Sequence, residues 1–134
     1  MSDTCRILVM DVESIVRGVV GEMLNSAGYQ VEFAADGEEA VRLYKKSTES
    51  TKPFDAVVMD LVAPGAVEGA EAARKILDID PNAKLILSSA YPSDSALYDY
   101  RKHGFQAAVS KPYKRETLHE VLQRIINESK TGSA

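Results

Sequence analysis

Residues 54–60 read FDAVVMD, a short apolar run that ends in a carboxylate, Asp60. The continuously apolar part predicts a strand over about 56–59 that is covered by helices on both faces. Four further runs of this kind lie at 6–10, 30–34, 84–88 and 105–109. Each of the five runs is followed by a segment of helical period. The sequence therefore predicts five βα units built around a parallel sheet.

The five helical segments differ in how clearly they are marked. The first starts near Ser14, and we expect its apolar stripe to face the core (Ile15, Val16, Val19, Val20, Met23, Leu24 and Ala27). The second spans about 37–47 with Asp36 as its cap, the third about 70–78, and the fourth about 94–102. The fifth carries apolar residues at helical spacing from Leu118 to Ile126. Right-handed crossovers then favour a doubly wound sheet with strand order 2-1-3-4-5.

Length and charge exclude several classes of protein. A chain of 134 residues predicts one domain, 1–128, followed by a flexible tail, 129–134. The net charge of −4 argues against direct nucleic-acid binding. Because no apolar run is long enough to span a bilayer and no leader pattern is present, we expect a cytoplasmic protein. The two histidines, His103 and His119, show no ligand partners and are assigned to solvent.

Three charged residues follow the predicted first, third and fifth strands. These residues are Asp11, Asp60 and Lys111. In the order 2-1-3-4-5 those strands are close neighbours, so the three side chains should meet at the carboxyl edge of the sheet. Phosphoryl transfer needs a nucleophile, a divalent cation and a fixed positive charge. Asp60, Asp11 with Glu13, and Lys111 supply these parts, and a carboxylate can itself form an acyl phosphate.

Four segments in this order resemble the signature segments of bacterial response regulator receiver domains. The segments are ILVMDVES, DAVVMDLVAPG, LILSSAY and VSKPY, and the resemblance runs from about Arg6 to Asn127. It implies a flavodoxin-like, three-layer α/β sandwich with a five-stranded parallel sheet and five helices. Within the family, the chain looks most like the chemotaxis regulators.

The resemblance also implies a role for individual residues. Asp60 matches the aspartate that accepts a phosphoryl group, and Lys111 matches the lysine that pairs with the phosphoryl oxygens. Ser89 matches the hydroxyl residue that moves to bond the phosphate. For Mg²⁺, Asp11 matches the first acidic ligand and Val62 supplies the matching backbone carbonyl, with Asp60 as a further ligand.

The sequence departs from the family pattern at positions that affect this chemistry. Val12 stands where a second aspartate is usual, so we expect weakened Mg²⁺ binding that Glu13 compensates in part. Ala108 replaces an aromatic residue that swings inward on activation in many members. Val62 and Tyr91 are apolar or bulky at the two positions that govern water access, which predicts slow hydrolysis of the phosphorylated form.

The function implied is a phosphorylation-dependent switch of a two-component or phosphorelay pathway, a regulatory phosphoacceptor rather than an enzyme. Its partners would be a sensor histidine kinase or phosphotransfer protein, and a downstream protein bound by the fourth helix, fifth strand and fifth helix. A homodimer also stays open. The alternative is a pseudo-receiver, in which Val12 has removed productive Mg²⁺ binding and the domain serves only for docking or dimerisation. A nucleotide-binding protein is disfavoured because no glycine-rich phosphate loop is present.

Overall fold

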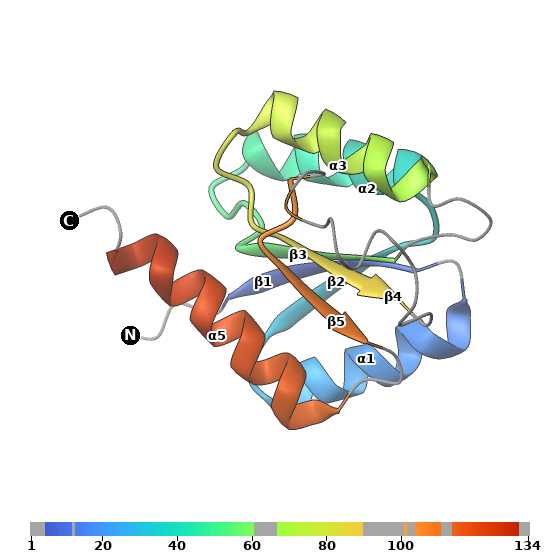
Figure 1. The fold of residues 1–134 in the computed structure, drawn as a ribbon, viewed down its shortest axis with the longest axis vertical. Coiled ribbons are helices and arrows are strands. Elements are labelled where there is room, and N and C mark those ends of the chain that lie inside the picture. Colours follow the sequence, from blue (N-terminus) through green and yellow to red (C-terminus); the bar gives the residue numbers. More distant parts are fainter. Residues whose placement is uncertain are drawn as a thin grey trace.

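A computed structural model of the protein describes residues 5–11, 13–60, 67–89, 101, 104–110 and 114–131. It contains one parallel sheet in which the strands follow the order β2-β1-β3-β4-β5 (Figure 1). This confirms the order expected from the sequence. The strands are β1 (Arg6–Met10), β2 (Gln30–Ala34), β3 (Ala56–Asp60), β4 (Leu85–Ser89) and β5 (Ala107–Ser110).

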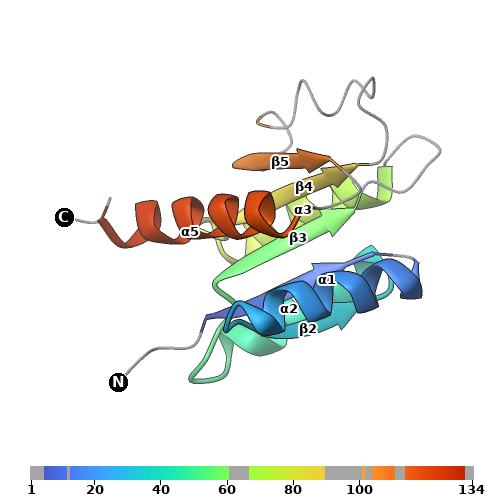
Figure 2. The same cartoon turned by 90° about the horizontal axis from the view of Figure 1, so that it is seen from below.

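Helices cover both faces of this sheet. The described helices are α1 (Ser14–Ser26), α2 (Gly37–Thr48), α3 (Val67–Ile79) and α5 (Arg115–Thr131). Helices α2 and α3 lie on one face and α1 and α5 on the other, which gives three layers (Figures 1 and 2). None of the helices in the described ranges is long and apolar enough to span a membrane.

Two of the expected segments differ from the structure or fall outside it. The fourth helix, expected at about 94–102, lies outside the described residues except for Arg101. Helix α5 continues to Thr131, so residues 129–131 of the expected tail are helical, and 132–134 lie outside the described ranges.

The core divides into two clusters because side chains alternate between the two faces of each strand. On the α2/α3 side, Met10, Met59 and Leu87 pack with helix residues such as Tyr44 and Ile76. On the α1/α5 side the sheet contributes a second set, joined by residues of the two helices (Ile7, Val9, Val58, Ile86, Val109, Val20, Leu24, Leu118 and Leu122). Every residue of β3 is buried, so the strand that ends in Asp60 lies inside both clusters.

Helix α1 does not bury the whole apolar stripe expected from the sequence. Val20, Gly21 and Leu24 are buried, whereas Ile15 is 80% exposed and Val19 is 46% exposed. The prediction was wrong for Ile15, Val19 and Ala27, which are exposed, because a stripe with two apolar positions per turn covers a wider arc of the helix than the sheet contacts. Helix α1 comes closest to β2 at Gly21, where an added Cβ would lie 2.6 Å from the Phe33 ring.

Two buried tyrosines connect elements that are distant in sequence. The Tyr44 hydroxyl donates to Asp80 Oδ2 at 2.7 Å, and burial, followed by this bond, raises the pKa of Tyr44. The Tyr29 hydroxyl lies 3.3 Å from His119 Nδ1 on α5, with the two rings edge to face. His119 is therefore half-buried and partnered, which corrects its assignment to solvent.

The cap expected for the second helix is confirmed. Asp36 precedes α2, and its Oδ1 accepts a hydrogen bond from the backbone N–H of Glu39 at 2.8 Å. The Glu39 carboxylate in turn accepts from the N–H of Ala35 at 2.7 Å, so the two side chains satisfy backbone donors at the start of the helix. Helix α2 is thereby fixed beside the edge strand β2.

Candidate functional site

Two buried carboxylates lie side by side at the carboxyl edge of the sheet. Asp60 is the last residue of β3, and Asp11 directly follows β1. Met10 and Met59 are partners in register, so Asp11 and Asp60 stand one position beyond a paired position on adjacent strands. Neighbouring strands are about 4.8 Å apart. The solvent exposure is 0% for Asp11 and 5% for Asp60.

The alternation of side chains places both carboxylates on the same side of the sheet. Met10 and Met59, one residue earlier, belong to the α2/α3 cluster, and Val9 and Val58, two residues earlier, belong to the α1/α5 cluster. The side chains of Asp11 and Asp60 therefore lie on the face of the sheet that α1 and α5 cover, near the start of α1. The predicted convergence of Asp11 with Asp60 is present in the structure.

Two negative charges this close are costly to bury unless positive charge lies nearby. A hard divalent cation such as Mg²⁺ suits the pair, because it takes oxygen ligands and usually binds through one or two carboxylates, with waters and phosphate oxygens completing the octahedron. Within the described ranges, no group of three or more His, Cys, Asp or Glu side chains gathers as a metal site. The two carboxylates at this edge match the small number of protein ligands that Mg²⁺ uses.

Asp11 is held in place by bonds to three other segments. Its N–H donates to the Ala34 carbonyl at 3.1 Å, which continues the contact of β1 with β2. Its Oδ1 accepts from the Glu13 N–H at 2.9 Å, and its carbonyl oxygen accepts from Arg17 Nη1 at 2.5 Å. Its Oδ2 is fully buried. Backbone and side chain of Asp11 are thus both fixed at the start of α1.

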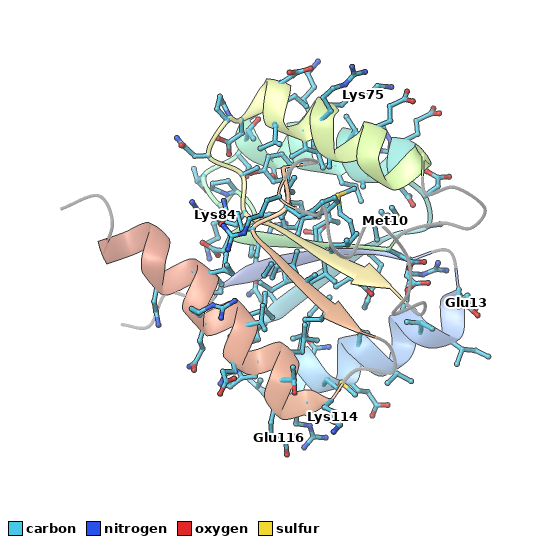
Figure 3. All side chains as sticks on the ribbon, viewed as in Figure 1. Met10, Glu13, Lys75, Lys84, Lys114 and Glu116 are labelled. Carbon is cyan, nitrogen blue, oxygen red and sulfur yellow. The ribbon has the colours of Figure 1, made fainter. Side chains whose placement is uncertain are left out.

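Glu13 contributes to this arrangement through its backbone. It is the residue before α1, and its side chain makes no capping bond to the helix. The residue is exposed, and Figure 3 shows it at the outer end of α1. Its predicted role as a partial substitute for the second acidic ligand stays a prediction, which would require the side chain to turn toward Asp11.

Ser88 is a buried polar residue that the sequence reasoning missed. It is the register partner of Asp60 on β4 and is 0% exposed. The signal in the sequence was a hydroxyl that continues the apolar run LIL on the strand next to the one that ends in Asp60. Alternation places it on the same side of the sheet as Asp60, because Leu87 belongs to the α2/α3 cluster.

The other expected site residues are placed only in part. Ser89 is the last residue of β4 and is paired in register with Ser110, the residue before Lys111. Lys111 itself lies outside the described residues, as do Val12, Val62 and Tyr91. Ala108 is half-buried on β5 and packs against the α2/α3 cluster.

Comparison with known proteins gives consistent matches in sequence. Residues 7–123 match the family described as the response regulator receiver domain. A chemotaxis protein CheY from Thermotoga maritima is 33% identical over 121 residues, which covers 90% of this chain and 96% of that protein. The sporulation initiation phosphotransferase F of Bacillus subtilis is 26% identical, over 90% of this chain and 93% of that protein.

Solved structures agree with the sequence matches. The receiver domain of a sensor histidine kinase from Pseudomonas aeruginosa, with a magnesium ion coordinated in its active site cleft, has a TM-score of 0.80 and 28% identity, covering 93% of this chain and 99% of that one. The response regulator protein TrrA from Thermotoga maritima, in complex with Mg²⁺ and BeF, has a TM-score of 0.75 and 30% identity, over 91% and 99%. Each likeness extends over most of both chains.

Proposed function

Because this chain belongs to the response regulator receiver family of two-component systems, we propose that it is a phosphorylation-dependent switch with Asp60 as the phosphoryl acceptor. The observation that carries the proposal is the placement of Asp60. It ends the central strand, is 5% exposed, and stands beside the buried Asp11 at one edge of the sheet. This arrangement supports a carboxylate nucleophile next to a cation site.

The transfer step follows from the chemistry of a carboxylate. An oxygen of Asp60 attacks the phosphorus of a phosphohistidine, the P–O bond forms as the P–N bond breaks, and the imidazole leaves with the electron pair and takes up a proton. Lys111 would pair with the phosphoryl oxygens as the fixed positive charge, and Ser89 would donate a hydrogen bond to them once the group has been transferred. The domain would in this way promote its own phosphorylation. In dephosphorylation, water would attack the phosphorus of the acyl phosphate, inorganic phosphate would form, and the Asp60 carboxylate would leave with the electron pair.

The residues proposed to bind Mg²⁺ are Asp11, Asp60, the carbonyl of Val62 and, in part, Glu13. The cation, when bound, would neutralise negative charge on the phosphoryl oxygens. Asp11 would bind and orient the cation through a carboxylate that is already fixed by Glu13 N–H. Val12 offers no oxygen from its side chain, so we propose that affinity for Mg²⁺ is lower than two adjacent carboxylates would give.

The proposed partners are a histidine kinase or phosphotransfer protein as donor and a downstream protein as receiver of the signal. The downstream protein would bind the face made by β5, α5 and the helix expected at about 94–102, of which β5 and α5 are described. We place the protein in the cytoplasm, where such partners present their phosphohistidine. Modification would shift the population between two arrangements of this face.

The donor protein must approach the edge of the sheet where Asp60 lies, and α1 begins at that edge. Ile15, in the first turn of α1, is 80% exposed, and Val19, one turn later, is 46% exposed. Exposed apolar side chains that lie together commonly mark contact surfaces between proteins. We therefore propose that Ile15 and Val19 contact the phosphodonor protein.

Ile15→Asp tests this contact. We expect phosphotransfer from the donor protein to slow roughly tenfold, because a charge replaces an apolar contact worth about 1–2 kcal/mol. Labelling of the same variant by acetyl phosphate should be unchanged, because that donor is too small to reach α1. Equal rates from the protein donor for wild type and variant would rule out the contact.

Labelling of the wild-type protein tests the proposed function itself. We expect acetyl phosphate to add one phosphoryl group in the presence of Mg²⁺, and far less after the cation is removed by a chelator. Intact-protein and peptide mass spectrometry would measure the mass gain and locate it at Asp60. A protein that gains no label and shows no response to Mg²⁺ would support the phosphorylation-independent docking module instead.

A further inference from the structure

Arg17 reaches from α1 back to the acceptor site. It lies on the second turn of the helix, is half-buried, and its Nη1 donates a hydrogen bond to the carbonyl oxygen of Asp11 at 2.5 Å. The sequence analysis assigned no role to this residue. The contact matters because the residue it holds is one of the two buried carboxylates of the site.

The bond from Arg17 adds to two others that hold Asp11. The Asp11 N–H donates to the carbonyl of Ala34 on β2, and the N–H of Glu13, just before α1, donates to Asp11 Oδ1. The carbonyl of Asp11 is the group through which the chain leaves the strand, so its direction sets where residues 12 and 13 begin. Holding that carbonyl therefore also holds the N–H that orients the carboxylate.

At the start of α1 the backbone N–H of Arg17 donates to the Glu13 carbonyl at 3.1 Å, but side chains other than that of Arg17 add little support. Glu13 precedes the helix without a capping bond from its side chain, and no acidic residue lies in the first turn. Val12, between Asp11 and Glu13, brings no side-chain oxygen to the loop. Asp11 is thus the main carboxylate of this segment for cation binding, with Glu13 contributing only in part, so the direction of the Asp11 side chain matters for affinity.

We propose that Arg17 is a positioning residue, which holds Asp11 in the direction that Mg²⁺ binding and phosphoryl transfer require. This inference rests on the proposed function. Groups that hydrogen-bond to a metal ligand from outside the coordination shell typically change metal affinity by about 10–100-fold when they are removed. Because Arg17 bonds the backbone of Asp11 rather than its carboxylate, we expect the lower end, about tenfold.

The charge of Arg17 predicts the opposite effect. A guanidinium close to a bound divalent cation repels it, so an arginine that acted through charge alone would weaken Mg²⁺ binding, and its removal would strengthen that binding. Positioning and charge therefore predict opposite signs for the same substitution. This difference in sign makes the inference testable with two variants.

The variants are Arg17→Met, which has neither charge nor donor, and Arg17→Lys, which retains both. We expect the Mg²⁺ dissociation constant to rise about tenfold in Arg17→Met and to stay within about threefold of wild type in Arg17→Lys. Calorimetric titration with MgCl₂ would measure both. Arg42→Met is the matched control, since Arg42 is exposed on α2 and pairs with Glu39 at 3.5 Å, away from the carboxyl edge of the sheet. Tighter binding by Arg17→Met, or equal binding by all variants, would overturn the proposal.

Hydrogen exchange at the Glu13 amide gives a second readout that needs no metal. We expect it to exchange about tenfold faster in Arg17→Met than in wild type, because the N–H that bonds Asp11 Oδ1 is less well held. If wild type neither binds Mg²⁺ nor accepts a phosphoryl group, the proposed function has failed, and unchanged exchange at Glu13 would then overturn the role of Arg17 as well. If Arg17→Met does not fold, Arg17→Gln, which is too short to reach the Asp11 carbonyl, takes its place with the same expected results.

Discussion

Asp60→Asn is expected to abolish labelling of the protein by acetyl phosphate, with a loss of roughly three orders of magnitude or more. The amide nitrogen and oxygen of asparagine cannot form an acyl phosphate, while the size and shape of the side chain are retained. Asp60 is 5% exposed at the end of a strand that is buried throughout, so the side chain of asparagine should occupy the same place. Mass spectrometry of the intact protein after incubation with acetyl phosphate and Mg²⁺ would measure the loss.

The matched control is Asp78→Asn, which makes the same chemical change at an exposed position on α3. It should be labelled at the rate of wild type. Persistent labelling of Asp60→Asn, with the modification mapped elsewhere, would contradict the proposed acceptor. The Asp60 variant should also unfold at a higher temperature in the absence of Mg²⁺, since it removes one of two adjacent buried negative charges.

Val12→Asp is expected to strengthen Mg²⁺ binding by about 2 kcal/mol, or roughly thirtyfold in the dissociation constant. The substitution adds a carboxylate directly after Asp11, where receiver domains usually carry their second acidic residue. The gain is limited because the new carboxylate also loses solvation and repels Asp11 when no cation is bound. Calorimetric titration of both proteins with MgCl₂ would give the two constants.

Val12→Asn separates the charge from the shape of the new side chain, and we expect it to bind Mg²⁺ within about threefold of wild type. The unfolding temperature provides a second check. Without Mg²⁺, Val12→Asp should unfold at a lower temperature than wild type, and saturating Mg²⁺ should raise its unfolding temperature more than that of wild type. Equal affinities for Val12→Asp and wild type would show that residue 12 does not limit cation binding.

The sheet could be predicted from the sequence because its signal is local and repeated. Each strand is a short apolar run, and the handedness of the crossovers leaves few ways to order five such runs. An apolar run does not fix where a strand begins, as β5 shows, because the expected strand was 105–109 and the observed one is Ala107–Ser110. Phe105 was expected in the strand, but it is buried in the α2/α3 cluster ahead of β5, which begins at Ala107. Apolar character reports burial, and pairing with a neighbouring strand is a separate property.

The site was predictable where strand ends alone determine position. Asp11 and Asp60 come together because parallel register carries the carboxyl ends of β1 and β3 to the same edge of the sheet. Ser88 and Arg17 were missed for a different reason. Their importance depends on a partner that only the folded chain brings close. Strand register places Ser88 beside Asp60, and the first turns of α1 bring Arg17 back to the Asp11 carbonyl. The burial of α1 was mispredicted on the same ground, since periodicity does not say how much of a helix the sheet covers.

The burial of all five residues of β3 has a consequence for how this protein can evolve. The strand pairs with β1 on one side and β4 on the other, so a change at any of its positions disturbs two neighbouring strands as well as Asp60. Amino-acid substitutions that change function without loss of the fold should therefore occur mainly in the segments that follow the strands. Residue 12, which follows Asp11 in the sequence, is a position of this kind. We expect Val12 to lower the affinity for Mg²⁺ without any change in the strand that carries Asp60.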